Sequence, residues 1–321
     1  MSRSNSTLFV VLVSLLGIAP AASEPYAYVA NEAAGTVSII DTQTDKVAST
    51  LKVGDKPRGI TASVDGARLY IAHDTGTLIE HDLYRDKNTA RITVGRSAKA
   101  IQPSPDGKSL SIVVDDGVVL IDMATLRVTK TIRIDDPNVE RATFSPDGRW
   151  IYANAKEGDS IRVIDVVKGS LGSSIKVGRG ATSIGFLPDG SRAYAVVGDE
   201  IVAIDVARRE VVARAKSPGG LGDAVVHPDG KRVFVSAVNA GSVLVFDSAS
   251  NRFIASVKVG DGPSDMALTA DGGKLYVACR GSNDVSVIDT ATYKRIEDIH
   301  VGARPSGIVV SEPPTLPRDG D

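Results

Sequence analysis

Five basic residues are the strongest candidates in this sequence for a binding site: Lys56, Arg58, Arg96, Lys99 and Arg304. Guanidinium and ammonium groups hold carboxylates and phosphates through charge-assisted hydrogen bonds. A cluster of such groups would therefore bind an anionic small ligand or an acidic protein surface. Together with Asp55, which lies beside Lys56, the five residues carry a net charge of +4. They can act together only if the fold brings their three segments to one place.

No other residues have the spacing of a known catalytic or metal site. The histidines, at positions 73, 81, 227 and 300, fall at different places in their segments, and no His, Cys, Asp or Glu group has zinc spacing. The sequence contains no CxxCH for covalent haem, no GxSxG, no P-loop and no Rossmann glycine fingerprint. We therefore assign no catalytic residue, expect neither a metal site nor a cofactor, and favour a protein that is not an enzyme.

The elements that position the basic residues are internal repeats, marked by an aspartate that ends a short apolar strand. This aspartate recurs seven times at intervals of 40 to 43 residues: Asp41, Asp82, Asp122, Asp165, Asp205, Asp247 and Asp289. A second marker, an Asp-Gly turn, occurs six times, first at Asp65-Gly66 and last at Asp271-Gly272. An aspartate present in every repeat is best explained as a turn-fixing residue, because its side chain can accept backbone N–H bonds.

Each repeat contains four short strands, which predicts an all-β, seven-bladed β-propeller of four-stranded antiparallel blades. The chain begins on the second strand of a unit, at residues 26–30, and ends on a first strand, at residues 306–311. The carboxy-terminal strand should therefore pair with the amino-terminal strands and close the ring. An aromatic column along the second strands should fill the space between blades: Tyr28, Tyr70, Tyr152, Tyr194, Phe234 and Tyr276, with Ser111 as the exception.

The turns of such a blade alternate between two faces, so the joints between blades share one face with the loops that follow the second strands. All five basic residues lie in joints: Arg304 precedes blade 7, Lys56 and Arg58 precede blade 1, and Arg96 and Lys99 precede blade 2. Arg58 and Lys99 begin innermost strands and should lie nearest the axis. We expect the channel mouth on this face to focus a positive potential. The alternative is that these are solvated turn charges, partly offset by Glu32 and Asp74.

The joints before blades 3 and 6 have the opposite composition. Asp135, Asp136 and Glu140 lie beside Arg141 in the first, and Asp261 and Asp265 lie in the second. The charge on this face is therefore expected to be divided into a basic and an acidic sector.

The chain ends suggest an exported protein. Residues 1–23 have the features of a signal peptide: Arg3, an apolar run too short to span a bilayer, and small residues before Glu24. The alternative is a buried amino-terminal helix. Residues 24–311 would form the propeller, and the Pro-rich, charged residues 312–321 a disordered tail. We expect a periplasmic or secreted monomer with no membrane anchor after cleavage.

Charge and cysteine content narrow the function further. The formal net charge of −2 argues against bulk binding of nucleic acid. The single cysteine, Cys279, excludes an internal disulfide and is expected to be a buried, inert thiol rather than a reactive one.

Several segments resemble the YVTN-type repeats of exported bacterial seven-bladed propellers. They include YVAN and GTVSIIDTQTDKV near the start, and SNDVSVIDTATYKRI and VGARPSGIVV near the end. The resemblance covers residues 26–311 and is weaker in blades 2 and 4. It implies a periplasmic or surface propeller. Some relatives accompany oxidation that depends on pyrroloquinoline quinone (PQQ), and others are similar to the haem d1 propellers of nitrite reductases or to propeller lactonases.

These observations favour a non-catalytic binding or scaffold protein. It could be accessory to a periplasmic quinoprotein oxidation system, with a periplasmic dehydrogenase as partner. The alternative is a propeller enzyme, either a lactonase-like hydrolase or a haem d1-type redox protein. The resemblance supplies no catalytic residue for either enzyme, because no histidine is expected near the central channel.

Overall fold

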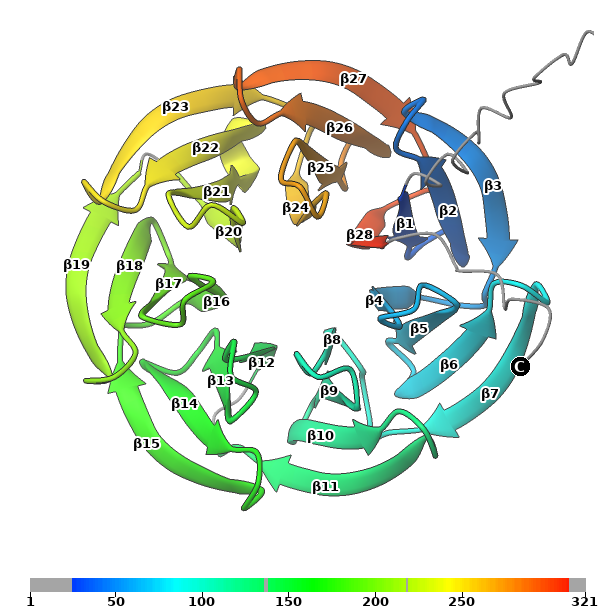
Figure 1. Ribbon diagram of the computed structural model, residues 1–321, viewed down its shortest axis with the longest axis horizontal. Helices are drawn as coiled ribbons and strands as arrows, with labels where there is room; N and C mark the ends of the chain where they lie inside the picture. Colours follow the sequence, from blue (N-terminus) through cyan, green and yellow to red (C-terminus); the bar gives the residue numbers. More distant parts are fainter. Residues whose placement is uncertain (1–24, 136–137, 218, 312–321) are drawn as a thin grey trace, which may run out of the picture.

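The chain folds into a closed ring of seven blades around a central channel (Figure 1). The computed structural model describes residues 25–135, 138–217 and 219–311. The expected signal segment at residues 1–23, the expected tail at residues 312–321 and Asp136 lie outside the described residues. Within the described residues there are 28 strands in seven four-stranded antiparallel sheets, so the predicted fold class is confirmed.

The strands run outward from the axis in each blade. Blade 1 contains β4 (Pro57–Ala62), β5 (Arg68–His73), β6 (Thr77–Asp82) and β7 (Lys87–Thr93). Blade 2 contains β8 (Ile101–Pro103), β9 (Ser109–Val114), β10 (Gly117–Asp122) and β11 (Arg127–Arg133). Blade 3 contains β12 (Val139–Phe144), β13 (Trp150–Ala155), β14 (Ser160–Asp165) and β15 (Ser170–Lys176). Blade 4 contains β16 (Ala181–Phe186), β17 (Arg192–Val197), β18 (Glu200–Asp205) and β19 (Glu210–Lys216). Blade 5 contains β20 (Leu221–Val226), β21 (Arg232–Ala237), β22 (Ser242–Asp247) and β23 (Arg252–Lys258). Blade 6 contains β24 (Pro263–Leu268), β25 (Lys274–Cys279), β26 (Asp284–Asp289) and β27 (Lys294–His300). A short 3-10 helix, η1 (Val238–Ala240), follows β21.

Blade 7 joins the two ends of the chain. Its strand order is β28 (Pro305–Ser311), β1 (Tyr26–Asn31), β2 (Thr36–Asp41) and β3 (Lys46–Lys52). β28 pairs antiparallel with β1, with Tyr26 opposite Ser311 and Val29 opposite Ile308. The ring is therefore closed by hydrogen bonds between the first and last described strands, as the repeat pattern predicted.

The repeated aspartates fix turns, which confirms their structural interpretation. In all seven blades the aspartate that ends the third strand accepts the N–H of the residue three positions on; the bond from Lys168 to Asp165 Oδ1, for example, is 2.9 Å. The six Asp-Gly turns use a second device. Their glycines have φ angles between 66° and 74°, in the left-handed region that favours glycine.

The core lies between neighbouring blades. Tyr152 of β13 is fully buried and packs with Ala193 and Val202 of blade 4. The other aromatic residues of the second strands are buried in the same way, as expected. This packing leaves the innermost strands facing the central channel. No helix in the described part of the chain is long and apolar enough to span a bilayer.

Candidate functional site: the mouth of the channel

A cavity of about 700 Å³ opens where the channel meets the joint face, and we call it the mouth cavity. Of the five basic residues selected from the sequence, Arg58, Lys99 and Arg304 line it. Lys56 and Arg96 are exposed and do not line it. Lys56 precedes β4 in a left-handed conformation, with φ of 55°, and lies outside the strand that points Arg58 toward the axis.

Three further basic residues line the mouth cavity, and the sequence analysis did not select them. Arg141 comes from β12, Lys156 from the loop after β13, and Arg280 from the loop after β25. The two loops belong to the same face as the joints, so a search of those loops for basic residues would have found Lys156 and Arg280. Arg141 was assigned to an acidic joint instead.

Several of these cations have carboxylate partners that do not line the cavity. Arg58 Nη1 lies 3.3 Å from Asp74 Oδ1, and Lys99 Nζ lies 3.9 Å from Asp115 Oδ1. Arg280 pairs in the same way with Glu32. Burial opposes ionisation of Asp74, but hydrogen bonds from Arg58 and Ser97 lower its pKa overall. The cationic groups therefore face the cavity with their counter-charges behind them.

Two other cations of the mouth cavity have no such partner. Among the residues that the structure describes, neither Lys156 nor Arg304 has a carboxylate within 4 Å.

Arg141 crosses the channel. Its Nη2 lies 2.8 Å from Asp265 Oδ1 of β24 and 3.3 Å from Asp223 Oδ1 of β20, three and two blades away around the ring. Burial, with a further contribution from the charge of Asp223, raises the pKa of Asp265 to about 6, although Arg141 opposes the shift. Arg141 thus reaches across from the opposite wall and pairs with Asp265, one residue of the expected acidic sector.

Asp223 and Asp265 also hold neighbouring innermost strands together. Asp223 Oδ2 accepts the N–H of Met266 at 3.2 Å, and Asp265 Oδ2 accepts the N–H of Ile308 at 3.1 Å. At the equivalent position of β28, a Cβ on Gly307 would lie 2.4 Å from the carbonyl oxygen of Arg58. In β20 and β24 this position therefore holds a side chain that accepts a neighbouring N–H, and in β28 it holds glycine. Both carboxylates are scaffold groups already occupied by partners.

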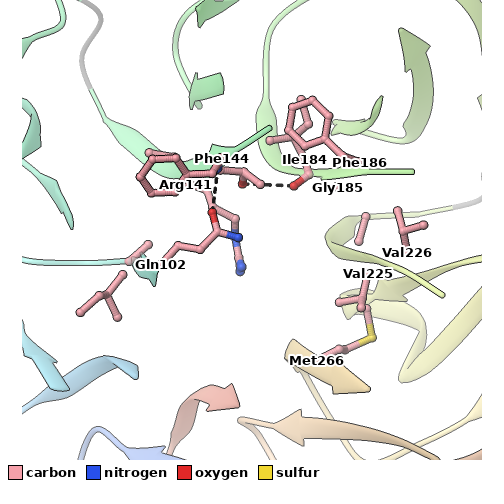
Figure 2. A pocket seen from close by; sticks show the side chains of 14 residues that line it. Gln102, Arg141, Phe144, Ile184, Gly185, Phe186, Val225, Val226 and Met266 are labelled. Atoms are coloured by element: carbon pink, nitrogen blue, oxygen red, sulfur yellow. Dashed lines mark hydrogen bonds between the residues drawn. The ribbon is translucent and has the colours of Figure 1, made fainter. Parts of the chain in front are cut away.

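A second cavity of about 370 Å³ lies deeper in the channel, and we call it the apolar chamber (Figure 2). Phe144, Ile184, Phe186, Val226 and Met266 are among the residues of its walls. Its two polar uncharged side chains already have bonds to the backbone, as Figure 2 shows. Gln102 accepts the N–H of Phe144 at 2.9 Å, and the Thr143 hydroxyl donates to the carbonyl of Ile184 at 3.2 Å.

The histidines and the cysteine lie away from both cavities. His73 Nδ1 is 2.8 Å from the carbonyl oxygen of Asp55, and His227 Nε2 is 3.0 Å from that of Gly272. His81 is buried in β6, and His300 is exposed at the end of β27, an outermost strand. Burial raises the pKa of the Cys279 thiol to about 12, which agrees with an inert cysteine. In the described residues no three His, Cys, Asp or Glu side chains gather in a way that could hold a metal.

Comparison with solved structures finds the same fold in proteins of low sequence identity. A functionally unknown protein from Desulfotomaculum acetoxidans is 19% identical, with a TM-score of 0.79, over 90% of this chain and 99% of that one. A "putative 6-phosphogluconolactonase" from Bacteroides uniformis is 18% identical, with a TM-score of 0.74, over 90% and 99%. Dihydro-haem d1 dehydrogenase NirN is 16% identical, with a TM-score of 0.69, over 88% and 74%.

Sequence comparison gives a family. No curated protein matches the chain. The family model described as lactonase, 7-bladed beta-propeller, matches residues 128–295, more than half of the sequence. The chain belongs to the lactonase family of seven-bladed β-propellers.

Proposed function

We propose that this protein is an exported binding protein that holds a small anionic molecule in the mouth cavity without transforming it. The observation that carries the proposal is the convergence of basic side chains from five blades on one opening: Arg58, Lys99, Arg141, Lys156, Arg280 and Arg304. Three carboxylates also line the opening: Asp223 and Asp265 are occupied by Arg141 and by backbone N–H groups, and Glu140 offsets one further positive charge, so the six basic residues remain in excess. The positive potential is therefore left for a ligand.

The size and shape of the site favour a small molecule over a protein surface. A cavity of about 700 Å³ is in the usual range for small-ligand sites. The neighbour from Bacteroides uniformis suggests 6-phosphogluconate as a first probe, since it carries both a carboxylate and a phosphate. Binding should weaken as salt rises, because ions screen charges at an open mouth.

A pair of double variants tests the site. Arg58→Ala with Lys99→Ala removes two charges that line the mouth cavity, and calorimetry should show affinity for 6-phosphogluconate at least tenfold weaker. Lys56→Ala with Arg96→Ala is the matched control, since it removes the same charge from the same two joints outside the cavity. If both double variants lost the same affinity for 6-phosphogluconate, the loss would come from the change in net charge and not from the mouth cavity. Binding that neither salt nor either variant changes would reject the mouth cavity as the site.

An acidic surface of a periplasmic dehydrogenase, for example one linked to PQQ-dependent oxidation, is the alternative occupant. Acidic protein partners that bind in a salt-dependent way, with no response to 6-phosphogluconate or other small anions, would favour it. The export proposal rests on residues 1–23 and predicts a periplasmic or secreted protein that begins near Glu24. Cell fractionation and amino-terminal sequencing test this directly.

Lactone hydrolysis is the second candidate function, favoured by membership of the lactonase family. Asp265, which lines the mouth cavity and has a pKa of about 6, is the candidate base, and it would have to release its bond with Arg141 to take a proton from water. Water would attack the lactone carbonyl, the ring C–O bond would break and a hydroxy acid would leave. Proton release during incubation with γ- and δ-lactones, abolished by Asp265→Asn, would establish hydrolysis and overturn the non-catalytic proposal.

A further inference from the structure

The mouth cavity and the apolar chamber meet in the channel. Ala100, Ile101 and Arg141 line both cavities. Arg141 thus lies at the boundary between a basic compartment and an apolar one. In the described residues its contacts with Asp223 and Asp265 use Nη2 alone, so the donors on Nε and Nη1 remain for a ligand.

The walls of the apolar chamber suit a hydrocarbon group. They come from five neighbouring innermost strands, β8, β12, β16, β20 and β24, and consist mainly of aliphatic and aromatic side chains. Phe186, Val225 and Val226 are only half-buried, and Figure 2 shows Val225, Val226 and Met266 facing Phe144 and Gln102 across the chamber. Covering this surface with an apolar group would remove it from water, which is favourable.

From this arrangement we propose that the ligand is an amphipathic monoanion, a carboxylate with an unbranched or aryl hydrocarbon body. The carboxylate lies in the mouth cavity beside Arg141 and Lys99, and the hydrocarbon body extends into the apolar chamber. The proposal rests on the binding function proposed above and adds the ligand class. A sugar acid would meet only the basic compartment and leave the apolar chamber exposed to water.

A series of straight-chain carboxylates from acetate to decanoate, titrated by calorimetry, tests the ligand class. Affinity should rise about three- to fourfold for each added methylene until the chamber is filled, and then level off. The uncharged octanol should bind much more weakly than octanoate. The Arg58→Ala, Lys99→Ala variant should weaken the whole series by a similar factor.

Two equivalent valines supply matched variants. Val226 of β20 lines the apolar chamber, whereas Val310 occupies the same strand position in β28 and lines neither cavity. Both side chains are half-buried. Val226→Asp should remove the dependence on chain length, whereas Val310→Asp should preserve that dependence. Val226→Asn provides a milder second variant if Val226→Asp does not fold.

The outcomes separate the two proposals. If acetate or 6-phosphogluconate binds but affinity does not change with chain length, the amphipathic ligand is rejected and the anion site stands. If affinity still rises with chain length in the Val226 variants, the apolar chamber is also rejected as the site of the hydrocarbon. If none of these anions binds, the proposed binding function fails, and this inference with it.

Discussion

Asp223 and Asp265, which line the mouth cavity, each have a partner for both carboxylate oxygens. Asp265 accepts one backbone N–H and pairs with Arg141, and its equivalent in β20, Asp223, does the same. Asp223 also accepts the hydroxyl of Ser183 at 2.7 Å. A buried ion pair of this kind contributes little net stability, but removing one partner leaves an uncompensated charge.

The raised pKa of Asp265 gives a pH dependence with a defined sign. Its folded pKa of about 6 lies above the usual value near 3.9, so the folded state binds the proton more tightly. The stabilising contribution is complete below about pH 4 and is lost as pH rises through 6. The wild type should lose about 2 kcal/mol relative to Asp265→Asn between pH 4 and pH 7, measured by urea unfolding. A difference that stays constant with pH would contradict the shift.

Loss of a turn aspartate should have a smaller effect on stability than the pH change described for Asp265. Asp165→Ala removes the acceptor for the N–H of Lys168 and should lower the free energy of unfolding by about 1 kcal/mol, without affecting anion binding. Asp116→Ala, at an exposed aspartate, is the control and should change stability by less than about 0.5 kcal/mol. Weaker binding with unchanged stability would mean that Asp165 belongs to a site.

At the scale of single elements, β6 departs from the pattern of the other blades. Glu80 and His81 are buried at positions that hold apolar residues in all six other blades, for example Val163 and Ile164. Arg68 pairs with Glu80, with 3.9 Å between Arg68 Nε and Glu80 Oε2. The equivalent Arg232 of blade 5 instead donates to the carbonyl of Thr290 in the next blade at 2.6 Å. A hollow of about 520 Å³ between blades 1 and 2 accompanies this difference.

Restoring the pattern should stabilise blade 1. Glu80→Val with His81→Ile replaces a buried carboxylate and imidazole by the residues of blade 3, and the free energy of unfolding should increase by about 1 to 2 kcal/mol. His81→Ile alone separates the two contributions. A loss of stability in the double variant would show that the ion pair of Glu80 with Arg68 and the hydrogen bond that Glu80 accepts from the Thr89 hydroxyl outweigh apolar packing.

Single elements and their turns could be predicted from the sequence, whereas contacts across the ring could not. The repeat spacing predicted the blades, the turn aspartates and the closure because these depend on local hydrogen bonds and on a period visible in the chain. Of the five basic residues selected from the sequence, Arg58, Lys99 and Arg304 line the mouth cavity. Arg141 was missed because its partners Asp223 and Asp265 are 82 and 124 residues away, and only the ring geometry brings a side chain of blade 3 to blade 6.

For the whole molecule, stability depends on the seam between β1 and β28. Removing residues 306–321 takes away β28 with its buried Ile308 and exposes the edge of β1, and the unfolding temperature should fall markedly. Removing only residues 312–321 leaves β28 in place and is the control, with an unchanged unfolding temperature expected. Equal temperatures for the wild type and the longer deletion would contradict closure by this strand.

The seam between β1 and β28 can form only when synthesis of the chain is nearly finished. β1 is made first and its partner β28 last, so blade 7 is a three-stranded sheet with a free apolar edge until the final strand is available. Such an edge can pair with any exposed strand of suitable sequence. The best alternative partner is β28 of a second molecule, whose register with β1 is already encoded. Crowded refolding should therefore produce domain-swapped dimers, in which each ring is completed by the other chain.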